Sequence, residues 1–139
     1  PNHLAAIGYS QLKRIEKFNQ ARNKIAELYN SELSKHFNKI KTPLKPKGYT
    51  HSYQMYTITV ESKIRNKLLH FLKENNIEAS AHFDPPLHTQ KYLKKYFKKK
   101  LPVTDKLSKE IITLPIFPDM TKKEVLYVIR TIKKFMEIR

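Results

Sequence analysis

Residues 53–61 read YQMYTITVE, and residues 62–75, SKIRNKLLHFLKEN, follow them without a break. Aromatic and β-branched residues alternate with a period of two in the first stretch, which is typical of a half-buried strand. The second stretch has helical spacing, with Ser62 placed to cap its start and Asn75-Asn76 placed to end it. Its apolar positions are Ile64, Leu68, Leu69 and Leu72. A strand followed directly by an amphipathic helix predicts a mixed α/β fold.

The N-terminal quarter of the chain predicts a long helix. Residues 2–36 contain no proline and one glycine, and their apolar residues are mostly three, four or seven positions apart. This spacing predicts one helix, which Asn2 can cap and which can bend near Gly8. Residues 39–50 hold two prolines and a glycine and predict a connector. The predicted apolar stripe consists of Leu4, Ile7, Leu12, Ile15, Phe18, Ile25, Leu28 and Leu33.

Three further segments follow the helix predicted over residues 62–75. Residues 77–83 predict a second strand, because they lie between the helix stop and the Pro85-Pro86 corner. Residues 89–97 predict a short and very basic helix. The next helix is expected to start at Thr104 or Asp105 and to carry Leu107, Ile111 and Ile112 toward one side.

The C-terminal part predicts an extended segment over residues 113–117 and then a closing helix. Thr121 and Glu124 have the T-x-x-E spacing, in which the two side chains satisfy free N–H groups at a helix start. The buried face of this helix is predicted to be Val125, Val128, Ile129, Ile132, Phe135 and Met136. The element order indicates a small two-layer α/β sandwich preceded by a long N-terminal helix. We therefore expect one domain over residues 1–139, with a linking helix over 1–38 and the α/β unit over 50–139.

The composition fits a single domain. The chain has 139 residues, 40% of them hydrophobic, and no cysteine, so disulfides and thiolate metal sites are excluded. No apolar run approaches the length of a membrane span, and a cytoplasmic location without membrane contact is expected. The sequence begins at Pro1 without an initiating Met, and we expect it to be a fragment of a longer protein.

The net charge of +16 leaves two readings open. A basic module that binds nucleic acid is one, since six lysines fall between residues 91 and 100. A lysine-rich solvated surface is the other and is favoured, because the chain has no aromatic and basic signature of an RNA-binding sheet. Direct binding of nucleic acid is therefore not expected.

Residues 82–88, HFDPPLH, are the first candidate for chemistry. His82, Asp84 and His88 are metal-ligand types, but they stand on an extended, proline-fixed turn and lack the helical or hairpin spacing that brings three or four ligands to one metal. No G-x-S-x-G turn is present, and two glycines forty residues apart exclude a phosphate-binding glycine loop. No metal site and no complete set of catalytic residues is predicted.

Several ordered motifs resemble one enzyme family. Residues 1–12, PNHLAAIGYSQL, are similar to the A-A-x-G-x-x-Q-L helix of the DegT/DnrJ/StrS sugar aminotransferases, which use pyridoxal phosphate. The H-S-Y of residues 51–53 with Tyr56, and residues 77–88 with their H-F-x-P-P-L-H, resemble the family's next two segments. The L-P-V of residues 101–103 and the L-P-I-F-P of residues 114–118 are similar to its last two. The resemblance extends over essentially the whole chain.

The resemblance implies the C-terminal small domain of a fold-type-I aminotransferase, with the helix that leads into it. The intact protein is then expected to be a homodimer that moves an amino group from glutamate to a nucleotide-linked keto sugar for surface polysaccharide or glycan synthesis. The family's Schiff-base lysine, and with it the catalytic and cofactor-binding residues, would belong to the larger N-terminal domain. We therefore expect this piece to be inactive alone and not to hold pyridoxal phosphate. A dehydratase branch, in which a histidine replaces that lysine, stays open.

The same resemblance implies which residues are expected at the sugar-binding cleft. They are His51, Tyr53, His82, Phe83 and His88. Phe83 stands where many relatives have tyrosine, so any hydrogen bond of that phenol is lost here. Asn76 stands where relatives often have glycine, and asparagine can take the left-handed conformation that glycine favours.

Overall fold

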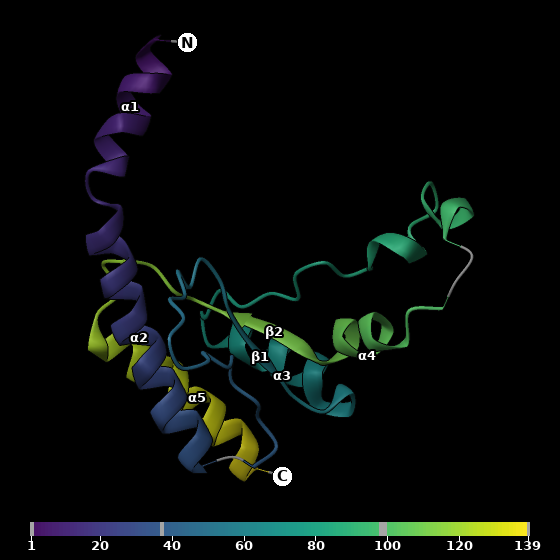
Figure 1. Ribbon diagram of the computed structural model, residues 1–139. Helices are drawn as coiled ribbons and strands as arrows, with labels where there is room; N and C mark the ends of the chain where they lie inside the picture. Colours follow the sequence, from purple (N-terminus) through teal and green to yellow (C-terminus); the bar gives the residue numbers. More distant parts are fainter. Residues whose placement is uncertain (1, 37, 98–99, 139) are drawn as a thin grey trace.

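The computed structural model describes residues 2–36, 38–97 and 100–138, so Pro1, Lys98 and Lys99 of the motifs above lie outside the described residues. Helices and a small antiparallel sheet form the fold (Figure 1), and the predicted α/β class is confirmed. The elements are α1 (Asn2–Leu12), α2 (Ile15–His36), β1 (Tyr56–Thr59), α3 (Ser62–Glu74), η1 (Leu87–Thr89), η2 (Lys94–Tyr96), α4 (Pro102–Glu110), β2 (Ile111–Leu114) and α5 (Lys122–Glu137).

The sheet pairs β1 with β2 in antiparallel register. Tyr56 lies opposite Leu114 and Thr59 opposite Ile111. A single bridge extends each edge, from Lys41 to Thr59 and from Ser80 to Thr113. The Thr57 and Thr113 hydroxyls lie 2.9 Å apart across the two strands.

Both predicted strands were too long. The strand expected over residues 53–61 is confirmed only over β1, because Tyr53 has a φ of 45°, which strand backbone does not adopt. The strand expected over 77–83 is wrong except for the bridge at Ser80, since the Ala79 N–H turns back to the Ile77 carbonyl. Within the predicted extended segment 113–117, the structure has strand only to Leu114 and starts it earlier, at Ile111.

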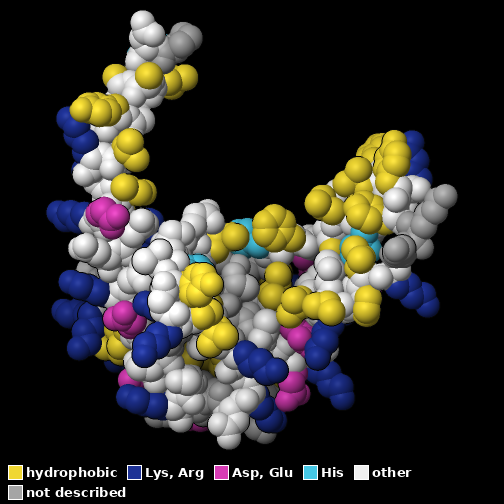
Figure 2. All heavy atoms as spheres, in the orientation of Figure 1, with side chains coloured by type: hydrophobic (Ala, Val, Ile, Leu, Met, Phe, Trp, Pro, Cys, Tyr) yellow, Lys and Arg dark blue, Asp and Glu magenta, His cyan; other side chains and the backbone are white. Residues whose placement is uncertain are grey.

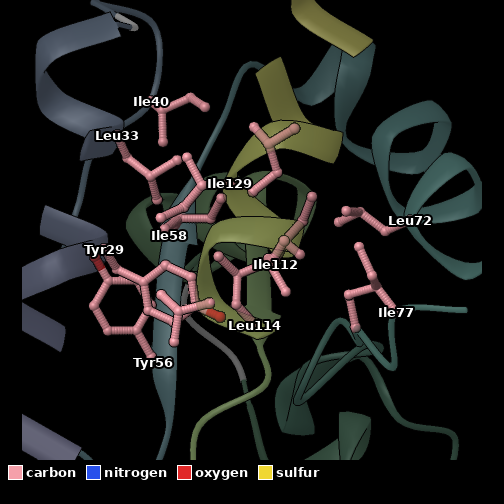
Figure 3. Close-up of a cluster of buried hydrophobic side chains, with 14 of the residues drawn as sticks. Tyr29, Leu33, Ile40, Tyr56, Ile58, Leu72, Ile77, Ile112, Leu114 and Ile129 are labelled. Atoms are coloured by element: carbon pink, nitrogen blue, oxygen red, sulfur yellow. The ribbon is translucent and has the colours of Figure 1, made fainter. Parts of the chain in front are cut away.

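The core lies between the sheet and helices α2, α3 and α5. Helix α5 packs against α2 on one side and α3 on the other, and α3 also contacts β2. Full burial of one aliphatic side chain contributes about 1.5–3 kcal/mol, so this cluster carries most of the stability. Figure 3 shows its centre, with Tyr29, Leu33, Tyr56, Ile58, Leu72, Ile112, Leu114 and Ile129 gathered from all these elements.

The long N-terminal helix is in fact two helices. The chain leaves helical geometry at Lys13 and Arg14, where the Arg14 N–H donates to the Gln11 carbonyl at 3.0 Å, and resumes at Ile15. Gly8 lies inside α1, so the predicted bend there is wrong. No residue of α1 is buried, and the helix extends away from the body (Figure 1). The predicted stripe enters the core only from Ile25 onward.

The central helix has the expected end but a different start. Asn75 is the C-cap of α3, and Asn76 has a φ of 56°, so both the predicted stop and the left-handed asparagine are confirmed. Ser62 is the first helical residue and Glu61 occupies the N-cap without a side-chain bond, so the Ser62 cap is wrong.

The later helices show one confirmed start and two corrections. Thr121 and Glu124 form the predicted capping box of α5. Helix α4 begins at Pro102 because proline fits the first helical turn, and Ile111 and Ile112 belong to β2 instead of that helix. The basic helix expected over residues 89–97 is replaced by the short turns η1 and η2.

Candidate functional site

The segment just before β1 brings His51 and Tyr53 together. Their rings lie 4.1 Å apart, and the Tyr53 backbone N–H donates to His51 Nδ1 at 2.9 Å. An imidazole whose Nδ1 accepts a hydrogen bond carries its hydrogen on Nε2 when neutral. The left-handed backbone at Tyr53 allows its N–H to reach a side chain only two positions earlier in the chain. His51 is exposed, so it offers one N–H donor of defined tautomer at the surface.

Side chains of helix α2 hold this segment in place through hydrogen bonds to its main chain. The Asn23 side-chain amide donates to the His51 carbonyl at 2.7 Å, and Arg22 Nε donates to the Ser52 carbonyl at 2.8 Å. Because both bonds hold main-chain atoms, they set the path of the chain without engaging the His51 ring. A shallow recess of about 390 Å³ opens here, lined by Pro43, His51, Ser52, Gln54, Met55 and Thr57.

A buried stack of tyrosines supports Tyr53. Tyr53 is 2% exposed and its ring lies 6.1 Å from that of Tyr56, which stacks on Tyr29 at 4.8 Å. The Tyr56 hydroxyl donates to Asn30 Oδ1 at 2.6 Å, and the Tyr29 hydroxyl donates to the Pro115 carbonyl at 3.1 Å. Burial raises the pKa of both phenols, so they stay neutral donors inside the core.

A second turn holds His82 and Phe83. We call this turn and the segment with His51 and Tyr53 the two histidine corners. His82 Nδ1 lies 3.0 Å from the hydroxyl of Ser80, the residue that bridges to β2. The Phe83 ring is 6.3 Å from the His82 ring and 73% exposed, on a backbone with a φ of 59°. The peptide bond between Asp84 and Pro85 is cis. The corner therefore presents an imidazole and an aromatic ring side by side at the surface.

A buried arginine, which our sequence analysis overlooked, anchors this corner. The Arg65 guanidinium on α3 contacts the Asp84 carboxylate at 2.9 Å and the Ser108 and Lys109 carbonyls at 3.1 and 3.2 Å. It is 7% exposed. The signal was present, because Arg65 stands three positions before Leu68 and seven before Leu72, on the buried stripe of the helix.

His88 is joined to neither histidine corner by these contacts. Its Nε2 lies 2.7 Å from Asp105 Oδ1 on α4, its side chain is 11% exposed, and its ring meets the edge of Phe97. We call residues 85–97 the arm. The His88–Asp105 pair clasps the arm to α4, and a mostly apolar pocket of about 450 Å³ lies between them, lined in part by Phe83, Leu87, Phe97, Leu101 and Leu107.

The structure thus groups the predicted residues into one pair of an exposed histidine and a buried tyrosine, one exposed pair of histidine and phenylalanine, and one clasp, and their binding role stays a prediction. Figure 2 shows hydrophobic side chains gathered on α1 and on the arm, with an open space between these projections. Exposed apolar residues on them include Leu4, Ile7, Leu12, Leu87, Tyr92 and Tyr96. Within the described residues no group of three or more His, Asp or Glu side chains is placed to hold a metal, and no helix is long and apolar enough to cross a membrane.

Comparisons with known proteins agree with this fold. The sequence profile of the DegT/DnrJ/EryC1/StrS aminotransferase family matches residues 1–133. The uncharacterized protein MJ1066 of Methanocaldococcus jannaschii is 34% identical over 95% of this chain and 36% of its own length.

Two solved structures show the same relationship. A DegT DnrJ EryC1 StrS aminotransferase from Brucella abortus superposes with a TM-score of 0.82 at 29% identity, over 91% of this chain and 33% of its own. NtdA from Bacillus subtilis, solved with bound cofactor PMP, shares the fold with a TM-score of 0.83 at 22% identity, over 96% of this chain and 32% of its own. The chain spans about a third of the length of these relatives. It belongs to the DegT/DnrJ/EryC1/StrS aminotransferase family.

Proposed function

We propose that this chain is the small domain of a pyridoxal-phosphate-dependent aminotransferase that transfers an amino group from glutamate to a nucleotide-linked keto sugar. The observation that carries the proposal is the family match over residues 1–133, together with two exposed histidine corners at positions that resemble the family's motifs. In this proposal residues 1–38 link the domain to the rest of the protein, and residues 50–139 form the α/β unit. A surface polysaccharide or related glycan is the proposed end product, made in the cytoplasm.

The two corners have separate roles in this proposal. His51 donates its Nε2–H to a hydroxyl or phosphate oxygen of the substrate, because Nδ1 is already occupied by the Tyr53 N–H. Tyr53 orients that ring from the core. His82, held by Ser80, contacts the sugar, and Phe83 packs on its apolar face. His88 acts through the clasp with Asp105, which sets the position of the arm.

The cofactor does not fit the residues described in this chain. A Schiff-base lysine needs an enclosed amine and a phosphate needs a cradle of main-chain N–H groups, whereas none of the described lysines is buried. Neither Gly8 nor Gly48 lies in a glycine-rich turn. Pyridoxal phosphate acts as an electron sink where it is bound, and we place that site in the part of the whole protein outside this chain. The chain alone is then inactive.

The proposal is tested on the whole protein, which we call the parent protein. The parent protein should be yellow, glutamate should bleach the cofactor band, and a nucleotide-linked keto sugar should restore it. The isolated chain should stay colourless with added pyridoxal phosphate. A colourless parent protein that gains no band with added cofactor would contradict the proposal. Loss of water from a nucleotide sugar, without transfer of an amino group to it, would support the dehydratase alternative.

Substitution of His51 separates substrate binding from folding. In the parent protein His51→Gln removes the imidazole donor, and the KM for the sugar substrate should rise about tenfold with an unchanged cofactor band, since one charge-assisted hydrogen bond is worth about 1.5–3 kcal/mol. His70→Gln is the matched control, because His70 is an exposed histidine on α3, where it pairs with Glu74. Equal KM values in the two variants would remove His51 from the site.

A further inference from the structure

The arm is a basic surface that the roles above do not use. Residues 85–97 contain three lysines and no acidic residue. Lys91, Lys94 and Lys95 are exposed, and none of the ion pairs between described residues includes them. Like charges this close repel one another, and an anionic ligand relieves that repulsion.

Two tyrosines interleave with these lysines. The Tyr92 side chain is 82% exposed and the Tyr96 side chain 70%, in contrast to the buried tyrosines of the core. The Lys95 ammonium lies 5.0 Å from the centre of the Tyr96 ring. Exposed aromatic faces among cations bind a flat ring by stacking while the cations take a neighbouring phosphate.

The arm is held in a defined shape. The His88–Asp105 clasp fixes it to α4, and the Thr89 hydroxyl donates to the Pro86 carbonyl at 2.8 Å. Further along, the Leu93 N–H donates to the Gln90 carbonyl at 3.0 Å. The backbone that carries the tyrosines and lysines therefore has a defined path, which lowers the entropy cost of binding a small ligand.

We propose that the arm binds the nucleoside diphosphate part of the substrate, with Tyr92 or Tyr96 stacking on the base and Lys94 and Lys95 contacting the phosphates. This proposal rests on the proposed function, because the arm continues directly from the His82–Phe83 corner assigned to the sugar. One exposed tyrosine ring, Tyr92 or Tyr96, with two neighbouring lysines matches a ligand that has one base and two phosphates. A single-stranded nucleic acid presents the same chemistry in repeats and is an outcome of the test.

The test measures binding of uridine diphosphate to the chain by calorimetry, with uridine, inorganic pyrophosphate and a short oligo-uridylate as separate probes. Uridine diphosphate should bind more tightly than uridine or pyrophosphate. Lys94→Gln with Lys95→Gln should weaken it about fivefold, since each exposed charge contact is worth up to about 1 kcal/mol. Tyr92→Ala with Tyr96→Ala should weaken it about tenfold and leave pyrophosphate unchanged, because a stacked base is worth about 1–3 kcal/mol.

Matched controls keep the charge and aromatic counts equal. Lys122→Gln with Lys123→Gln removes two exposed charges at the start of α5, and Tyr9→Ala with Tyr49→Ala removes two aromatic rings that are 63% and 72% exposed. Circular dichroism checks that every variant folds. Equal losses in control and arm variants overturn the proposal, as does absence of uridine diphosphate binding. Tight binding of oligo-uridylate that the arm substitutions abolish, without tight binding of the diphosphate, assigns the arm to nucleic acid instead.

The parent protein separates this proposal from the proposed function. A parent that transaminates with the same KM after Lys94→Gln and Lys95→Gln overturns the role of the arm and leaves the function standing. A parent that never transaminates, with a chain that binds uridine diphosphate through the arm, overturns the function and leaves the binding site standing.

Discussion

Arg65 and Asp84 form an ion pair of 2.9 Å between a side chain that is 8% exposed and one that is 39% exposed. The asymmetry matters, because the arginine is removed from water while the aspartate keeps part of its hydration. The Ser108 carbonyl also accepts from the same guanidinium, at 3.1 Å. One cation thus joins α3, the corner that carries His82, and the end of α4.

Loss of the arginine should cost more than loss of the aspartate. Arg65→Met should lower the free energy of unfolding by about 3 kcal/mol, because it leaves buried carbonyls without a donor and breaks the pair. Asp84→Asn keeps the shape and one acceptor oxygen, and should cost about 1 kcal/mol. Urea unfolding of both variants checks this. Equal costs would show that the carbonyl bonds of Arg65 contribute little.

The His88–Asp105 clasp should control the order of the arm. His88→Gln keeps a polar group but loses the imidazole contact with Asp105 at 2.7 Å and the packing on Phe97, so it should cost about 1 kcal/mol. Hydrogen exchange should become faster at the amides of residues 87–97 and stay unchanged in α5. His70→Gln on α3 serves as the control, and similar exchange in both variants would mean that the clasp does not order the arm.

The capping box of α5 should make stability depend on acid. The Thr121 N–H, and then its hydroxyl, donate to Glu124 Oε2 at 2.7 Å, and these bonds lower the pKa of Glu124 from its ordinary value of 4.5. A lowered pKa contributes stability above the ordinary value, and this is lost as pH falls through the folded-state value.

Two substitutions measure this box separately. Thr121→Ala removes the N-cap oxygen and should cost about 1 kcal/mol at neutral pH, whereas Thr121→Ser should cost little. Glu124→Gln no longer titrates, so its stability deficit relative to the native chain should shrink below pH 4.5. Thermal unfolding between neutral and acidic pH tests both. A deficit that stays constant with pH would show that the carboxylate bonds are not formed in solution.

The tyrosine stack should weaken the fold at alkaline pH. Burial raises the pKa of Tyr56, and the neighbouring Tyr53 and Tyr29 raise it further. The unfolded chain releases these protons from about pH 10 upward while the folded chain keeps them, so stability falls as pH rises above 10. Tyr29→Phe should cost about 1 kcal/mol at pH 7 through its bond to Pro115 and should reduce the loss above pH 10. Urea titrations at both pH values measure it, with Tyr49→Phe as the exposed control.

Features set by neighbouring residues could be predicted from the sequence. The capping box at Thr121 and the end of α3 at Asn75 and Asn76 depend on side chains within a few positions of the backbone groups they satisfy. Their chemistry is the same in any fold. The buried stripe of α5 was predicted for the same reason, since helical periodicity follows from local geometry.

Features set by distant residues could not be predicted from the sequence. The length of β1 depends on where β2 lies opposite, and the left-handed Tyr53 depends on bonds from α2 to His51 and Ser52. In the site, the family motifs indicated His51 and His82, but the pairing of His88 with Asp105 became visible only in three dimensions. Arg65 was overlooked because its partners lie 19 and 43 positions away.

The junction between α1 and α2 has a practical consequence. Lys13 and Arg14 form the non-helical step, both are exposed, and no side chain of α1 is buried. Trypsin cleaves after lysine and arginine where the backbone can leave its helix, so a brief digestion should cut here first. The product should keep the core from Ile25 onward and remain folded, which makes it a convenient shorter form for spectroscopy of the two histidine corners.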